Sequence, residues 1–249
     1  MYFKLIYIKG RRIIMNKKYV AMIPARLGSQ RIPKKNIRFL GGKPLIKYPI
    51  DFCLECDFFD SIWVNTESEE LGKAVETEKV HFHRRPPELA SNTATNRDFT
   101  YQFLKVHDCD YVVMVNPTSP LLRVETLKNF VAYVDENDFD VVFSVVSEKT
   151  ECFCEGKPVN FSLKEKINSQ FLTPVDRIAW AITAWKRDSF IKMQESGINP
   201  IFGGKIGLFS IPKDESCDLD TLEDWNIAEG MIVARNNKNT DNARYMDLG

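Results

Sequence analysis

Short, continuous apolar runs rich in β-branched residues most constrain how this chain can fold. The run at 112–115 reads Val-Val-Met-Val with no polar position, which is typical of a strand covered by helices on both faces. Longer amphipathic stretches separate such runs, and this alternation predicts a three-layer α/β fold with a mostly parallel sheet. We predict strands at 19–23, 61–66, 111–116 and 141–146, and helices near 44–55, 69–78, 96–106, 124–136 and 221–234, with Pro44 in the first helical turn.

The pattern divides the chain into one main domain, residues 15–235, with two flanking segments. Residues 1–14 precede a natural start, Met-Asn-Lys-Lys, and we interpret them as a flexible leader or an upstream-start artefact. Residues 236–249 are polar and predict a flexible tail. Residues 147–200 break the alternation, and we interpret them as a small insertion that forms a lid or a dimer contact.

Charge and composition exclude several functions. Lys+Arg and Asp+Glu both number 34, which argues against a broad nucleic-acid surface because phosphate neutralisation needs a basic face. No apolar run approaches the roughly 20 residues that span a bilayer. Cys53 and Cys56 have the spacing of a zinc or redox pair, but no second pair follows, and we favour buried or incidental thiols.

A basic loop follows the first predicted strand, where ligands of open α/β sheets bind. It offers backbone N–H groups near Gly28 and Ser29 together with the side chains of Arg26, Arg31 and Lys35. Oriented amides combined with cations suit a triphosphate. The loop matches neither a P-loop nor a G-x-G-x-x-G fingerprint, and a solvated basic loop is the alternative.

The order of residues in this loop resembles the acylneuraminate cytidylyltransferases (CMP-sialic acid synthetases), which carry a pattern close to A-R-x-G-S-x-R-x-P-x-K-N. The related Kdo cytidylyltransferases lack the Lys-Asn ending found here at 35–36. The resemblance implies a Rossmann-like nucleotidyltransferase fold. It also implies that Arg26, Ser29, Arg31 and Lys35 hold the triphosphate, that Asn36 lies near the nucleotide, and that Lys35 and Arg26 serve catalysis.

The segment 85–96 resembles the same family's R-P-x-E-L-A-x-D-x-A stretch. The resemblance implies that Arg85, the backbone near Ala94 and Asn96 read the cytosine edge, which needs defined donors and acceptors. Asn92 replaces the usual Asp. A loop with a helix cap is the alternative.

The acceptor side of the predicted site is less similar to the family. The turn 116–123 resembles Q-P-T-S-P-L-R and implies roles for Asn116, Thr118 and Ser119, with a purely structural turn as the alternative. Arg177 precedes a stretch that lacks the family's Asn-Gly and Tyr, so it is either a carboxylate ligand or a structural ion-pair residue. Trp180 and Trp185, further along the same stretch, are core residues or a sugar platform.

The segment 217–224 resembles the family's D-I-D-T-x-x-D stretch. Asp218 and Asp220 project from the same face of an extended segment and are suitable ligands for Mg²⁺, with Mn²⁺ as a substitute. The alternative role of Asp220 is that of a helix cap.

Together these motifs predict an enzyme that moves CMP from CTP to the anomeric hydroxyl of an acidic 2-keto-3-deoxy sugar of the sialic, legionaminic or pseudaminic type. The alternatives are a different acidic or phosphorylated acceptor, or a catalytically silent nucleotide-binding protein. We expect a cytoplasmic protein without a nucleic-acid or membrane partner. The resemblance also implies a homodimer.

Overall fold

A seven-stranded sheet forms the centre of the computed structural model, which describes residues 4–8, 11–237 and 246. The strand order is β13-β9-β12-β8-β3-β6-β7. β12 runs antiparallel to both of its neighbours, and the other pairings are parallel. The strands are β3 (Tyr19–Pro24), β6 (Phe59–Thr66), β7 (Val80–Arg84), β8 (Tyr111–Val115), β9 (Val141–Glu148), β12 (Val175–Lys186) and β13 (Ile206–Ser210). The prediction of a mostly parallel three-layer fold is confirmed.

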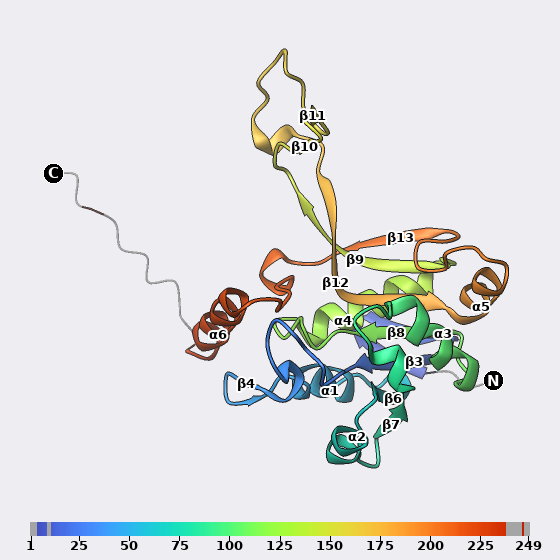
Figure 1. Ribbon diagram of the computed structural model, residues 1–249. Helices are drawn as coiled ribbons and strands as arrows, with labels where there is room; N and C mark the ends of the chain where they lie inside the picture. Colours follow the sequence, from blue (N-terminus) through green and yellow to red (C-terminus); the bar gives the residue numbers. More distant parts are fainter. Residues whose placement is uncertain (1–3, 9–10, 238–245, 247–249) are drawn as a thin grey trace.

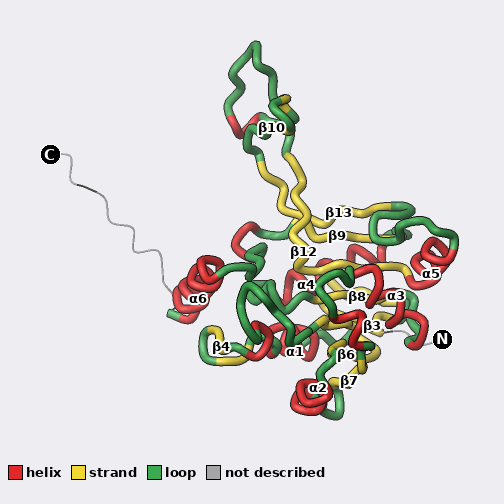
Figure 2. Tube along the Cα trace, viewed as in Figure 1, coloured by secondary structure: helices red, strands yellow, loops and turns green. Residues whose placement is uncertain are grey.

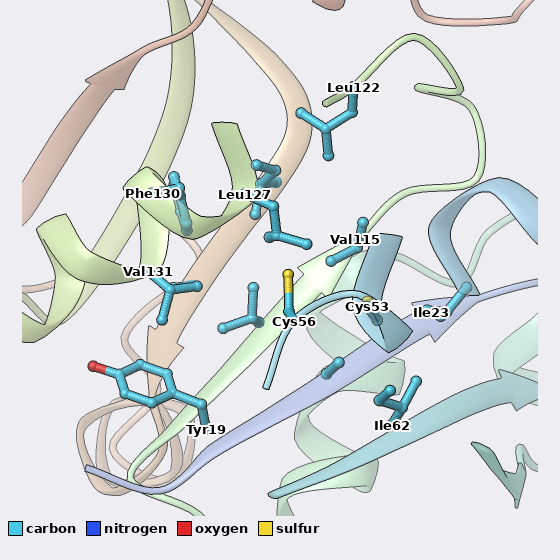
Figure 3. Packing of buried hydrophobic residues seen from close by; sticks show 14 of the residues in the cluster. Tyr19, Ile23, Cys53, Cys56, Ile62, Val115, Leu122, Leu127, Phe130 and Val131 are labelled. Atoms are coloured by element: carbon cyan, nitrogen blue, oxygen red, sulfur yellow. The ribbon is translucent and has the colours of Figure 1, made fainter. Parts of the chain in front are cut away.

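Helices cover both faces of this sheet (Figure 1). They are α1 (Lys47–Leu54), α2 (Glu69–Val75), α3 (Asn96–Val106), α4 (Val124–Glu136), α5 (Arg187–Glu195) and α6 (Leu222–Asn236). Cys53 of α1 and Phe130 of α4 pack in the core on one face, as Figure 3 shows, whereas Phe103 of α3 and Phe190 of α5 pack on the other. No helix within the described ranges is long and apolar enough to cross a membrane.

The carboxyl ends of β3, β6 and β8 lie at the same edge of the sheet. β8 is buried at every position, as its apolar sequence predicts. β3 pairs in parallel with β6 on one side and β8 on the other, so the loops after Pro24, Thr66 and Val115 leave the sheet in the same direction. This edge is where ligands of open parallel sheets bind.

The predicted start of the first helix at Pro44 is wrong. Pro44 lies in the two-residue strand β5 (Lys43–Pro44), which pairs with β4 (Phe39–Leu40), and α1 begins only at Lys47. The hairpin turn uses the positive φ angles of Gly41 and Gly42, which cost glycine little. This turn chemistry places Pro44 in the hairpin rather than in the helix.

The predicted insertion 147–200 contains two different structures. Residues 149–174, between β9 and β12, form an arm that projects from the sheet (Figures 1 and 2) and holds β10 (Phe153–Cys154), β11 (Lys157–Pro158) and the 3₁₀ helix η3 (Ser169–Phe171). In contrast, β12 and α5 belong to the central layers.

The flanking segments are only partly described. β1 (Lys4–Ile8) and β2 (Arg11–Met15) pair as an antiparallel hairpin beside α4; residues 1–3 and 9–10 lie outside the described residues. The prediction that 1–14 is a flexible leader or an artefact stays a prediction. α6 ends at Asn236, and of the predicted tail most lies outside the described residues.

Cys53 and Cys56 are buried free thiols, as we favoured from the sequence, and burial raises the pKa of the Cys56 thiol to about 12. No group of three or more His, Cys, Asp or Glu side chains suited to a metal occurs in the described part of the chain.

Candidate active site

An open pocket of about 230 Å³ lies at the carboxyl ends of β3, β7 and β8. It brings together residues of three sequence motifs that are far apart along the chain. Its lining residues are Pro24, Arg26, Ser29, Gln30, Arg31, Ile32, Lys35, Asn36, Arg85, Phe99, Asn116, Pro117 and Thr118. Of the predicted site residues, Gly28, Ala94, Asn96, Ser119, Arg177, Asp218 and Asp220 do not line it.

The basic loop is shaped by its own backbone contacts. The buried Asn36 donates from Nδ2 to the Arg26 carbonyl at 2.8 Å, and its own carbonyl accepts from Ile46 N at 2.8 Å. Lys34 adopts a left-handed conformation with φ of 53°, which is uncommon for a residue with a side chain. Ser29 N donates to the Leu27 carbonyl at 2.9 Å, so this amide is already engaged within the loop.

Arg26 connects the basic loop to the segment 85–96. Its Nη1 donates to the carbonyls of Ala90 and Ser91 at 3.2 and 2.8 Å, and to Asn92 Oδ1 at 3.1 Å. Asn92, the residue that departs from the family pattern, therefore binds Arg26 without neutralising it.

Lys35 and Arg31 meet an acidic group at the border of the pocket. Arg31 Nη2 lies 2.8 Å from Asp220 Oδ1, and Lys35 Nζ lies 3.7 Å from the same oxygen. Lys35 Nζ also donates to the Leu219 carbonyl. Burial lowers the pKa of Lys35, although Asp220 and Asp218 oppose that shift. Lys35 is thus a partly desolvated cation held in a fixed place.

Asp218 and Asp220 flank the fully buried Leu219 and, being two residues apart in an extended segment, share one side of it. Burial among surrounding atoms and the neighbouring Asp220 raise the pKa of Asp218, whereas a hydrogen bond with the Thr118 side chain opposes that shift. Asp218 nevertheless keeps an exposed surface. Because Leu219 N donates to the Thr118 carbonyl at 2.9 Å, the turn 116–123 holds the segment 217–224 against the pocket.

Thr221, rather than Asp220, caps α6. Asp224 N donates to Thr221 Oγ1 at 3.2 Å, and Asp224 Oδ2 accepts from Thr221 N at 2.7 Å. The Asp220 carboxylate does not cap the helix and instead contacts Arg31 and Lys35.

Arg85 is almost completely buried, at 3% exposure, yet its side chain reaches the pocket wall. It donates from Nε to Asn65 Oδ1 at 2.7 Å and from Nη2 to the Asn65 carbonyl at 2.9 Å. The guanidinium lies 4.2 Å from the centre of the Phe99 ring. Burial lowers the pKa of Arg85 to about 10, so it remains a cation at neutral pH.

The other two predicted base readers lie beside the pocket. Asn96 is the first residue of α3, which begins with a capping box formed by Thr95 and Asp98. Ala94 N donates to Ser91 Oγ at 3.2 Å. Phe99, one helical turn after Asn96, supplies the ring in the wall instead. The helical spacing from Asn96 could have indicated it; nothing in the local sequence indicated Asn65.

On the acceptor side, Asn116 and Thr118 line the pocket, whereas Ser119 is 2% exposed and closes the turn by donating from its N to the Asn116 carbonyl at 3.2 Å. Asn116 Nδ2 donates to the carbonyl of Trp180, which has an unusual φ of 56°. Asn116 thereby ties this wall of the pocket to β12.

Arg177 lies on β12 outside the pocket, with Nε 3.6 Å from Glu148 Oε2. The structure thus shows the ion-pair alternative rather than a pocket residue. Trp185 is fully buried core. Trp180 is half-buried and packs against Phe143 and Phe202.

These features define an α/β protein with a cationic pocket at the carboxyl ends of its parallel strands, the arrangement of a nucleotide-binding enzyme. The model of a family described as cytidylyltransferase matches residues 20–171. The chain belongs to this cytidylyltransferase family.

Individual relatives agree with this assignment. The chain is 29% identical over 218 residues to N-acylneuraminate cytidylyltransferase A of Danio rerio, covering 86% of this chain and 50% of that protein. It is 29% identical over 231 residues to pseudaminic acid cytidylyltransferase of Campylobacter jejuni subsp. jejuni serotype O:2, covering 85% and 95%. The chain thus spans about half the length of the first of these relatives.

Solved structures share the fold. CMP:2-keto-3-deoxy-manno-octonic acid synthetase complexed with CTP superposes with a TM-score of 0.62 at 17% identity, covering 88% of this chain and 99% of that chain. The 4-diphosphocytidyl-2C-methyl-D-erythritol synthase of Anaerococcus prevotii DSM 20548 gives 0.64 at 15% identity, covering 87% and 96%. At these identities the likeness concerns the fold.

Proposed function

We propose that this protein transfers CMP from CTP to the anomeric hydroxyl of an acidic 2-keto-3-deoxy sugar and releases pyrophosphate. The observation that carries the proposal is the convergence of Arg26, Arg31 and Lys35 on the pocket that Arg85 also lines, next to an acidic pair. Three cations suit a substrate with a triphosphate, whereas the whole chain carries no net charge. Family membership supports a cytidylyl group as the part transferred.

The chemistry follows from these positions. The acceptor hydroxyl attacks the α-phosphorus in line, the new P–O bond forms, the bond to the pyrophosphate oxygen breaks, and the hydroxyl proton passes to solvent. Lys35 and Arg31 hold the phosphates and stabilise the charge that builds up on them, so that positioning and electrostatics supply most of the acceleration. Lys35 is suited to this because its surroundings already fix it, and no reorganisation is needed when charge develops.

Asp218 and Asp220 would hold a magnesium ion, with Mn²⁺ as a substitute. The residues fit such an ion because two carboxylates lie on one side of an extended segment. Burial, together with the neighbouring Asp220, raises the pKa of Asp218. The described residues offer no third acidic or imidazole ligand, so water and substrate phosphates would complete the shell, as Mg²⁺ prefers. The ion would neutralise phosphate charge.

The names of the relatives support a nine-carbon acceptor of the sialic or pseudaminic type, and a legionaminic acid is a third candidate. Asn116 and Thr118 are the pocket residues proposed to meet it. We also propose a homodimer in the cytoplasm, where CTP is available. Exposed apolar side chains on the arm, at Phe153, Leu163 and Phe171, support contact with a second copy.

The test is magnesium-dependent pyrophosphate release, measured with each of four nucleoside triphosphates against a panel of acidic sugars. We expect release with CTP and one 2-keto-3-deoxy acid, and its loss in Lys35→Ala and Asp218→Asn. CTP binding without release from any pair would instead favour a silent nucleotide-binding protein. Release with a phosphorylated acceptor alone would show that the acceptor is not a 2-keto-3-deoxy acid.

A further inference from the structure

Arg85 is a buried cation whose fixed partner is neutral. Two of its guanidinium nitrogens are bound by one residue, Asn65, through the side-chain oxygen and the main-chain carbonyl. In the described part of the chain, no carboxylate forms an ion pair with Arg85. The acidic group that acts on Arg85 through its charge is Glu67. Its Oε1 accepts from Leu27 N at 2.8 Å, and its Oε2 is buried and accepts no hydrogen bond from the described residues.

Asn65 is itself held rigidly. It lies at the end of β6, has no exposed surface, and its carbonyl also accepts from Ala25 N at 2.9 Å. Its Nδ2 lies 3.4 Å from Met22 Sδ. Asn65 therefore ties the ends of β3 and β6 to the side chain that forms the wall of the pocket.

A buried, unpaired cation is costly unless an anion or a strong acceptor completes it. We propose that Asn65 is a positioning residue that fixes Arg85 for the nucleotide and, because it is neutral, adds no negative charge that would offset the charge of Arg85. The ligand class is the acceptor edge of a cytosine, whose O2 and N3 both accept hydrogen bonds, whereas N3 of uracil carries a hydrogen. The inference rests on the proposed function of this pocket.

Two substitutions separate charge from scaffolding. Asn65→Asp keeps the shape and the acceptor for Arg85 Nε but adds a carboxylate that pairs with the guanidinium. Asn65→Ala removes the side-chain acceptor and leaves a cavity, but the charge of Arg85 stays free. A purely structural role makes the alanine variant worse in every measurement. The proposal predicts opposite orders, with Asn65→Ala less stable and Asn65→Asp weaker in CTP binding.

The experiment measures CTP and UTP binding by titration calorimetry, and thermal unfolding, for the full chain and both variants. Asn199→Asp serves as the charge control, because its Oδ1 accepts from Ile201 N in an exposed loop and an aspartate keeps that bond. We expect CTP affinity to fall about tenfold to hundredfold in Asn65→Asp, with Tm near that of the wild type. Turnover at saturating CTP changes much less than KM.

The outcomes separate the two proposals. A wild-type chain that binds no CTP would overturn the proposed function and the role of Asn65 with it. A wild type that binds CTP, with Asn65→Asp binding as tightly as Asn65→Ala or tighter, would overturn the positioning role alone. A lower Tm in Asn65→Asp than in Asn65→Ala would also overturn the positioning role of Asn65.

Discussion

Acidification should destabilise this protein through a pair of histidines, His83 on β7 and His107 at the end of α3. His83 Nδ1 and His107 Nε2 lie 2.9 Å apart, and His83 Nε2 lies 2.8 Å from Gln102 Oε1 on α3. Burial lowers the pKa of both rings, that of His107 to about 4. His107 also packs against the rings of Trp63 and Phe103. The folded state therefore favours the neutral imidazole.

Because the folded pKa of His107 lies below the ordinary value of 6.5, the unfolded chain binds more protons between those values. The stabilisation is complete above pH 6.5 and is lost as the pH falls toward 4. One pKa unit corresponds to about 1.4 kcal/mol. Since His107 is only partly buried, solvent screening reduces the full shift to about 1–2 kcal/mol, or roughly 3–6 °C in Tm for a chain of this size.

The assay is thermal and urea unfolding at pH 7 and pH 4.5 for the wild type and His107→Gln. Glutamine keeps a polar group near His83 but does not titrate. Carboxylates contribute equally in both proteins, so their difference isolates the imidazole. We expect the variant to lose about 1–2 kcal/mol less than the wild type on acidification. Equal losses in the two proteins would refute the reasoning.

Three further predictions concern packing, capping and metal. Gly72→Ala places a Cβ 2.3 Å from the Phe82 ring and should cost about 1–3 kcal/mol in urea unfolding, whereas Gly230→Ala in α6, where a Cβ meets nothing within 4 Å, should be neutral or stabilising; an equal effect of both would contradict the packing argument. Thr221→Ala removes the capping box of α6 and should lower the unfolding free energy by about 1 kcal/mol, and an unchanged value would show that the cap is dispensable. Chelation with EDTA should abolish pyrophosphate release and Mg²⁺ or Mn²⁺ should restore it; release that survives chelation would rule out the metal role proposed for Asp218 and Asp220.

Some features of this protein are determined by short stretches of sequence. The uninterrupted apolar run at 112–115 determines a strand that is buried on both faces, because successive side chains point to opposite faces and all of them are apolar. The Thr221–Asp224 pair caps α6 through atoms three residues apart. The basic loop follows its strand directly, so its place at the carboxyl end of the sheet is also determined locally. These interactions are short-range, and the sequence shows both partners together.

Other features depend on which strand ends meet in space. Asn65 holds Arg85 from a neighbouring strand, and Arg31 meets Asp220 from the far end of the chain. The antiparallel β12 brings Arg177 to Glu148 instead of to the pocket. Strand order and register decide these pairs, because a side chain's partner is set by what the sheet places beside it. No local pattern encodes that neighbour, and only the tertiary structure supplied it.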